Sequence, residues 1–161
     1  MLKAAGNREK TEIFNIPMDV LMPIIKESLD AGQSVRFMPR GTSMLPMIRQ
    51  GIDSVVIGPV QGKLEKYDIP LYQRENGQYV LHRIVEVQET TYTCMGDNQF
   101  VRERGVKHEQ VIAVVTGFYR GKREYSVSAP GYKLYCRVWD YSRGLRHFWK
   151  RGMGWLRRHL K

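Results

Sequence analysis

The chain has 161 residues and a mass of 18.8 kDa, which fits one domain of ordinary size with a short appendage at either end. Hydrophobic residues make up 42% and aromatic residues 11%, a composition that excludes a largely disordered chain. The 26 Lys and Arg residues outnumber the 16 Asp and Glu residues, and the formal net charge of +10 favours a polyanionic partner. No run approaches the roughly 20 apolar residues that span a bilayer, and residues 1–10 lack the apolar core of a secretory signal, so we expect a cytoplasmic protein.

The first element predicted along the chain is a helix over about residues 18–30. A glycine that suits a helix end follows it, and its apolar residues recur at helical spacing. They are Leu21, Ile24, Ile25 and Leu29. We therefore assign residues 1–33 to an N-terminal tail and helix.

Residues 34–128 have the short apolar runs and Gly, Pro and Asn turns of a β domain. The expected strands are 35–38, 54–57, 69–72, 79–87, a strand ending at the turn 96–98, then 111–119 and 124–127. About seven short strands with few helices predict a mainly β fold.

Residues 129–161 return to helical spacing and form the third segment, a basic amphipathic helical segment of one helix or two. No acidic residue follows Asp140, whereas seven basic residues do. They are Arg143, Arg146, Lys150, Arg151, Arg157, Arg158 and Lys161. We expect this segment either to pack on the β domain or to lie in an anionic membrane interface, with nucleic acid a weaker candidate partner. In the membrane alternative, the residues expected to face the lipid are Trp139, Phe148, Trp149, Trp155 and Leu156.

No cofactor or metal is expected. The four histidines have no zinc-ligand spacing, and the sequence holds neither a P-loop nor a GxGxxG motif. The two cysteines, Cys94 and Cys136, are far apart, and we expect no disulfide between them.

The stretch 40–48 places one serine, Ser43, between a glycine and a proline inside an apolar run. A serine hydroxyl becomes a useful nucleophile only in a rigid turn beside a base and beside donors for an oxyanion. Gly41 permits close backbone approach to a substrate, and Pro46 fixes φ just past the turn. Ser43 is therefore the candidate nucleophile.

Two later stretches add a base and an acid in the order Ser, His, Asp. His82-Arg83-Ile84 lies in an expected strand, and Gly96-Asp97-Asn98 forms an expected turn. With the Gly-x-Ser-Met-x-Pro box, these motifs resemble the serine peptidase superfamily that joins type I signal peptidases to LexA-type self-cleaving repressors. The resemblance covers about residues 35–119. It is closest to the signal peptidases of the endoplasmic reticulum and archaea, which carry His-Arg-Val or His-Arg-Ile where other members carry a lysine base.

The resemblance implies a small coiled β-barrel and a Ser-His-Asp endopeptidase acting on a peptide or leader sequence. Ser43 would be the nucleophile, His82 the general base and Asp97 the acid that orients the histidine and raises its pKa above the usual 6.5. Substrate and oxyanion contacts would come from the neighbours of the serine. These neighbours are Gly41, Thr42 and Met44.

Several alternatives stay open at this point. Asp53 and Asp68 are further candidates for the carboxylate, and the Gly-Asp strand motif of the family is altered around both of them. A second possibility is a self-processing relative of the repressors, which would cut its own chain at the Ala5-Gly6 bond. It could also be a catalytically silent module that binds anionic membrane or nucleic acid through its basic C-terminus.

Overall fold

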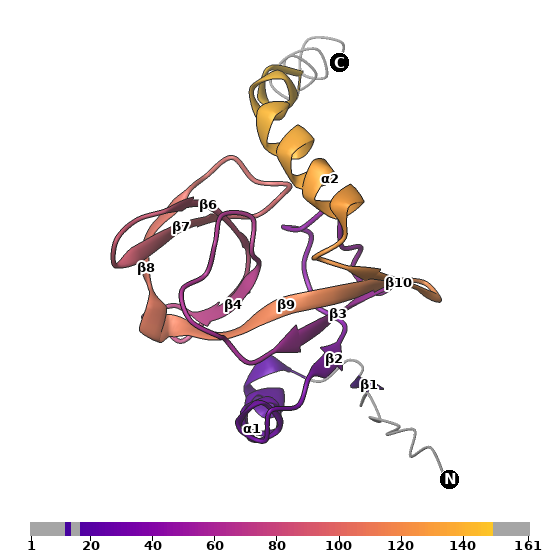
Figure 1. Cartoon of the computed structure of the whole chain (residues 1–161), viewed down its shortest axis with the longest axis vertical. Coiled ribbons are helices and arrows are strands. Elements are labelled where there is room, and N and C mark those ends of the chain that lie inside the picture. Colours follow the sequence, from indigo (N-terminus) through magenta and orange to yellow (C-terminus); the bar gives the residue numbers. More distant parts are fainter. Residues whose placement is uncertain (1–11, 14–16, 150–161) are drawn as a thin grey trace, which may run out of the picture.

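The computed structural model describes residues 12–13 and 17–149 (Figure 1). The fold is mainly β, with 34% strand against 26% helix, which confirms the predicted class. The strands are β1 (Glu12–Ile13), β2 (Val35–Phe37), β3 (Asp53–Gly58), β4 (Pro70–Gln73), β5 (Tyr79–Leu81), β6 (Arg83–Val87), β7 (Thr91–Met95), β8 (Glu103–Lys107), β9 (Val111–Arg120) and β10 (Arg123–Ser126). The helices are α1 (Met18–Asp30), the 3-10 turn η1 (His108–Gln110) and α2 (Pro130–Tyr141).

The described strands form two sheets. One runs β1-β2-β3-β9-β4-β5, with β10 added to β9, and the other runs β6-β7-β8. The long β9 joins the larger sheet together, because its first half pairs with β4 and its second half with β3. Neither sheet closes on itself, so the closed barrel that the resemblance implied is not formed by the described residues, although the coarser β-rich class holds.

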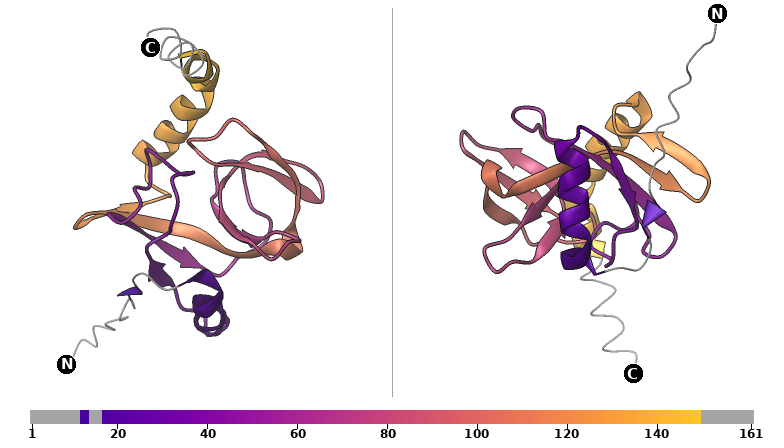
Figure 2. Two further views of the ribbon diagram at one scale, coloured as in Figure 1. Left: turned by 180° about the vertical axis from the view of Figure 1, so that it is seen from behind. Right: turned by 90° about the horizontal axis from the view of Figure 1, so that it is seen from below.

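The helix α1 has the bounds predicted from the sequence and covers the larger sheet (Figures 1 and 2). Four of its apolar residues are buried in the main core, against strands β2, β3 and β9. They are Leu21, Met22, Ile25 and Leu29. Ile24 was expected in this stripe but is half exposed, because Met22 takes the inward position instead.

A second core lies between the two sheets and includes Tyr72 of β4, Ile84 of β6 and Tyr92 of β7. The single strand expected over residues 79–87 is broken at His82. The part before His82 pairs with β4 in the larger sheet, and the part after it pairs with β7 in the smaller one. Residues 82–85 are all buried, so the alternation expected of a strand is lost. His82 therefore lies at the junction of the two sheets.

The helix α2 begins after β10 and contacts the strands through one face, and helical structure resumes over residues 143–149 after a turn at Ser142. Its inner face carries the buried Cys136 and a run of rings. Tyr132 packs on Phe118 with 5.7 Å between ring centroids, and Tyr135 stacks on Trp139 at 5.8 Å. Both cysteines are free and buried. Within the described residues, no helix is long and apolar enough to cross a membrane.

Candidate active site

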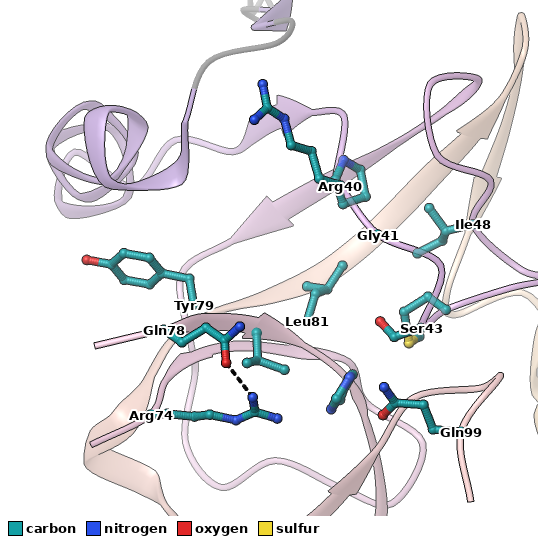
Figure 3. Close-up of a pocket in the computed structure, with 13 residues that line it drawn as sticks. Arg40, Gly41, Ser43, Ile48, Arg74, Gln78, Tyr79, Leu81 and Gln99 are labelled. Atoms are coloured by element: carbon teal, nitrogen blue, oxygen red, sulfur yellow. Dashed lines mark hydrogen bonds between the residues drawn. The ribbon is translucent and has the colours of Figure 1, made fainter. Parts of the chain in front are cut away.

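A cavity of about 230 Å³ lies between the loop that carries Ser43 and strand β5 (Figure 3). One wall is formed by residues 39–41 with Ser43 and Met44, and the other by residues 78–82. Figure 3 shows Ser43, Gln99 and Leu81 facing the same space from three different segments. The nucleophile and the base proposed from the sequence therefore line one cavity, although 39 positions separate Ser43 from His82.

The loop around Ser43 is held by backbone contacts. Gly41 has φ of +95°, a conformation that glycine adopts without strain, and its N–H donates to Gln50 Oε1 at 3.0 Å. The Ser43 carbonyl accepts a hydrogen bond from the Asn98 N–H at 2.8 Å. The Ser43 side chain is half buried, and its hydroxyl makes no hydrogen bond within the described part of the chain.

The Gly96-Asp97-Asn98 turn packs directly against this loop. A Cβ atom on Gly96 would lie 2.7 Å from the Ser43 carbonyl oxygen and 3.0 Å from Ser43 Cβ. The Asn98 side-chain amide also donates to the Thr42 carbonyl at 3.2 Å. Glycine is thus required at position 96 because the turn and the Ser43 loop touch through their backbones.

His82 is buried, and its Nδ1 faces a tyrosine and a glutamate. Nδ1 lies 3.4 Å from the Tyr72 hydroxyl and 3.8 Å from Glu103 Oε2. The Tyr72 hydroxyl donates its proton to Glu103 at 2.7 Å, so its oxygen is left to accept from Nδ1–H. This arrangement favours the tautomer in which Nε2 carries the lone pair, and Nε2 has no hydrogen-bond partner among the described residues.

Burial lowers the pKa of His82 from 6.5 to about 4. The charges of Glu103 and Asp97 act in the opposite direction, and that of Arg74 acts with burial. The expectation of a pKa above 6.5 was therefore wrong in direction, because desolvation of the ring outweighs the nearby carboxylates. His82 is neutral, and hence able to accept a proton, at pH 7.

Glu103 is held ionised by its neighbours. Arg74 donates through Nε to Oε1 at 2.7 Å and through Nη2 to Oε2 at 2.6 Å. The pKa of Glu103 is lowered, first by these hydrogen bonds, against an opposing effect of burial. Burial and the hydrogen bond to Glu103 raise the pKa of Tyr72, which keeps its proton. A fixed negative charge thus lies beside the Nδ1 edge of His82.

Asp97 has a different partner from the one predicted. Both of its carboxylate oxygens accept from the Arg83 guanidinium, at 2.8 Å from Nε and 2.7 Å from Nη2. Both side chains are almost completely buried, and no hydrogen bond joins Asp97 to His82 within the described residues. The carboxylate that lies beside the histidine is therefore that of Glu103 and not that of Asp97.

Arg83 connects three parts of the fold. Its guanidinium donates to the Tyr132 hydroxyl at 2.7 Å and to Cys136 Sγ at 3.0 Å, both on α2. It also reaches Met47 Sδ, four residues after Ser43, at 2.9 Å. Burial opposes its charge, but the hydrogen bonds and charge of Asp97 outweigh burial and raise the pKa of Arg83. The pair therefore ties the Asp97 turn, the Ser43 loop and α2 together.

The remaining predicted residues are divided between the cavity and other roles. Gly41 and Met44 line the cavity, whereas Thr42 does not, because its carbonyl is turned to Asn98. Asp53 is buried in a bidentate ion pair with Arg49, and Asp68 accepts from the Glu65 N–H. Neither of these two carboxylates reaches the cavity.

Three residues of the site were missed by sequence reasoning, namely Tyr72, Glu103 and Gln99. Strand β8, which begins at Glu103, was not predicted, because Glu103 to Lys107 has no apolar alternation. The sequence signal for Glu103 was its position as a carboxylate a few residues beyond the Gly-Asp-Asn turn. The described residues hold no cluster of three or more potential metal-ligating side chains. The chain matches no known family model, no curated protein sequence and no solved structure.

Proposed function

We propose that this chain is a serine endopeptidase in which Ser43 is the nucleophile and His82 the general base. The observation that carries the proposal is the shared cavity, where the loop of Ser43 faces a buried, neutral histidine whose Nδ1 side is occupied by Tyr72 and Glu103. The order of the motifs, which resembles that of the signal peptidase and LexA-type superfamily, supports the same reaction.

In the proposed mechanism, His82 Nε2 takes the Ser43 proton as the hydroxyl oxygen attacks a peptide carbonyl. The proton then passes from Nε2 to the leaving amine. In the second step, His82 takes a proton from water as the water attacks the acyl-enzyme, and returns it to the Ser43 oxygen as the acyl group leaves. The Glu103 carboxylate stabilises the imidazolium that forms. That assistance is needed because burial alone makes His82 a weak base.

The oxyanion would be bound by backbone donors. The N–H groups of Ser43 and Met44 have no hydrogen-bond partner within the described residues, whereas that of Gly41 is already used by Gln50. The Gln99 side-chain amide faces the cavity beside Ser43 and is a further candidate donor (Figure 3). Preorganised donors of this kind stabilise the charge that develops in the transition state.

An extended peptide fits the cavity best. Strand β5 is an end strand of the larger sheet and, among the described strands, pairs only with β4, so its other edge borders the cavity and can take up a substrate strand. About 230 Å³ leaves room for small side chains near the scissile bond. The class of substrate we propose is an extended peptide with small residues at the cut.

The test is cleavage of a library of extended peptides by the wild-type chain and four variants: Ser43→Ala, His82→Ala, their double variant and Thr42→Ala. Ser43→Ala should abolish cleavage, while Thr42→Ala, which removes the adjacent exposed hydroxyl outside the cavity, should retain it. The double variant Ser43→Ala/His82→Ala should be little worse than either single variant, because the two residues act as one unit. Cleavage that survives in Ser43→Ala would overturn the proposal.

The alternative of self-processing has its own readout. The bond Ala5-Gly6 lies outside the described residues, so its distance from Ser43 is not given by the structure. Intact mass after long incubation separates the two modes, because only self-processing removes residues 1–5 in a manner that depends on Ser43.

A further inference from the structure

The C-terminal helical segment carries a row of large apolar side chains on its outer surface. We call these six residues the α2 stripe: Leu134, Val138, Tyr141, Leu145, Phe148 and Trp149. Each is between 57% and 88% exposed. Their spacing of three and four residues places them along one side of the helical segment, where they form a continuous apolar surface. Contiguous exposed apolar surface of this kind marks an interaction site.

The opposite face of the segment is already occupied, which fixes the orientation of the stripe. Cys136 and Tyr132 contact Arg83, and the Trp139 indole donates to the Asp97 carbonyl at 3.2 Å. The Arg146 guanidinium lies 3.4 Å from the centroid of the Trp139 ring and donates to the Trp139 carbonyl. Trp139, which was expected to face a membrane, instead packs on the domain, and so the stripe is the side that remains exposed.

The surroundings of the stripe are basic. Lys133 and Arg137 are exposed on α2, each one position before a stripe residue. Asp140 is the last acidic residue of the sequence, and it is neutralised by Lys66 at 2.8 Å and by Arg143 at 2.9 Å. The sequence after it adds only basic charges, several of which lie outside the described residues. An apolar surface in a positive field is complementary to an anionic lipid bilayer.

We propose that the α2 stripe lies in the interface of an anionic membrane, with the helical segment parallel to the bilayer plane. Tyr141, Phe148 and Trp149 supply rings of the type that settle at the headgroup level, while Leu134, Val138 and Leu145 reach the acyl boundary. The segment extends beyond the strands, so a bilayer can approach it without meeting the sheets (Figures 1 and 2). A second copy of the chain is a poorer occupant, because a two-fold contact through this face would bring like charges together.

The test is co-sedimentation of the full chain with phosphatidylcholine vesicles that contain about 30% phosphatidylglycerol. Substituting Leu134→Ser, Leu145→Ser and Phe148→Ser together should weaken binding by at least roughly tenfold. The matched control is Val20→Ser with Ile24→Ser, since these two residues are 57% and 49% exposed on a helix at the opposite end of the molecule (Figure 1). The control should bind as the wild type does.

Binding should also fall several-fold between about 0.1 M and about 0.5 M salt, because basic residues contribute to it. Undiminished vesicle binding by the triple stripe variant would overturn the proposal, as would a wild-type chain that does not sediment with vesicles. Stripe-dependent dimerisation in sedimentation equilibrium without lipid binding would assign the surface to a second copy and would equally overturn it. Peptidase activity on free peptides should be unchanged in the triple variant, which separates this proposal from the catalytic one.

Discussion

At the scale of single residues, the burial of His82 determines how the proposed site can work. A buried imidazole resists protonation, and the adjacent Glu103 offsets only part of that effect, so the pKa falls to about 4. The ring is therefore ready to accept a proton over almost the whole physiological range. A more exposed histidine would lose this capacity near pH 6.5.

The first expected consequence is that kcat/KM falls only at unusually low pH. His82 acts as a base only while neutral, so kcat/KM should stay level from about pH 7 down to about pH 5 and fall as the pH drops through about 4. The measurement is kcat/KM for a cleaved peptide across that range, with circular dichroism to confirm that the fold persists. An inflection between pH 6 and 7 would contradict the burial argument.

A second expectation is that the charge of Glu103, unlike that of a carboxylate outside the cavity, contributes to catalysis. Glu103→Gln removes the charge beside Nδ1 and leaves the imidazolium unstabilised, so kcat should fall on the order of 10² to 10⁴-fold. Thermal stability should change little, because Arg74 is one-third exposed and remains hydrated. Glu86→Gln, an exposed substitution outside the cavity, is the control. Equal activity of the two variants would exclude Glu103 from the mechanism.

At the scale of elements, the turn 96–98 and the Ser43 loop behave as one unit. Gly96→Ala puts a methyl group 2.7 Å from the Ser43 carbonyl oxygen, and backbone cannot give way as a flexible side chain would. A displacement of about 1 Å at the nucleophile should cost roughly 10²-fold in kcat. Gly131→Ala is the control, since its Cβ would meet nothing within 4 Å. Unchanged peptidase kinetics in Gly96→Ala would show that the turn does not position Ser43.

The Arg83–Asp97 pair links strand β6 and the turn after β7 to α2, and its expected role is structural. Asp97→Ala leaves a buried guanidinium without its partner, which should lower the free energy of unfolding by about 3–5 kcal/mol. The double variant Arg83→Met/Asp97→Ala should be less destabilised than the sum of the single variants, because it removes both charges together. Urea denaturation of the wild type, Asp97→Ala, Arg83→Met and the double variant gives the coupling energy between the two side chains. Strict additivity would contradict the pairing.

Much of the fold was predictable from the sequence, and the site only in part. The helix α1 and the strands β2, β3 and β9 follow from local periodicity, which the main core then satisfies. The break at His82 was not predictable, since it depends on two sheets meeting there. The pairing of Asp97 with Arg83 was missed for the same reason. Which carboxylate faces a histidine is decided by tertiary packing and not by order along the chain.

At the scale of the whole molecule, the proposed site lies where the two sheets and the nucleophile loop converge. The larger sheet supplies β5 and Tyr72, β8 of the smaller sheet begins with Glu103, and Arg83 of β6 connects the smaller sheet to α2. The inner face of α2 thus belongs to the domain, while its outer face is the proposed membrane surface. Together, the two proposals combine a peptidase site and a surface for membrane attachment in one chain.

The most direct test of the central claim is acylation of Ser43 by a small activated ester, followed by intact-mass analysis and fragmentation. The wild-type chain should acquire one acyl group on Ser43, and Ser43→Ala should acquire none at that peptide. His82→Ala should acylate roughly 10² to 10⁴-fold more slowly, since the base is lost. A wild-type chain that is not acylated at Ser43, or a His82→Ala variant that is acylated at the wild-type rate, would contradict the account.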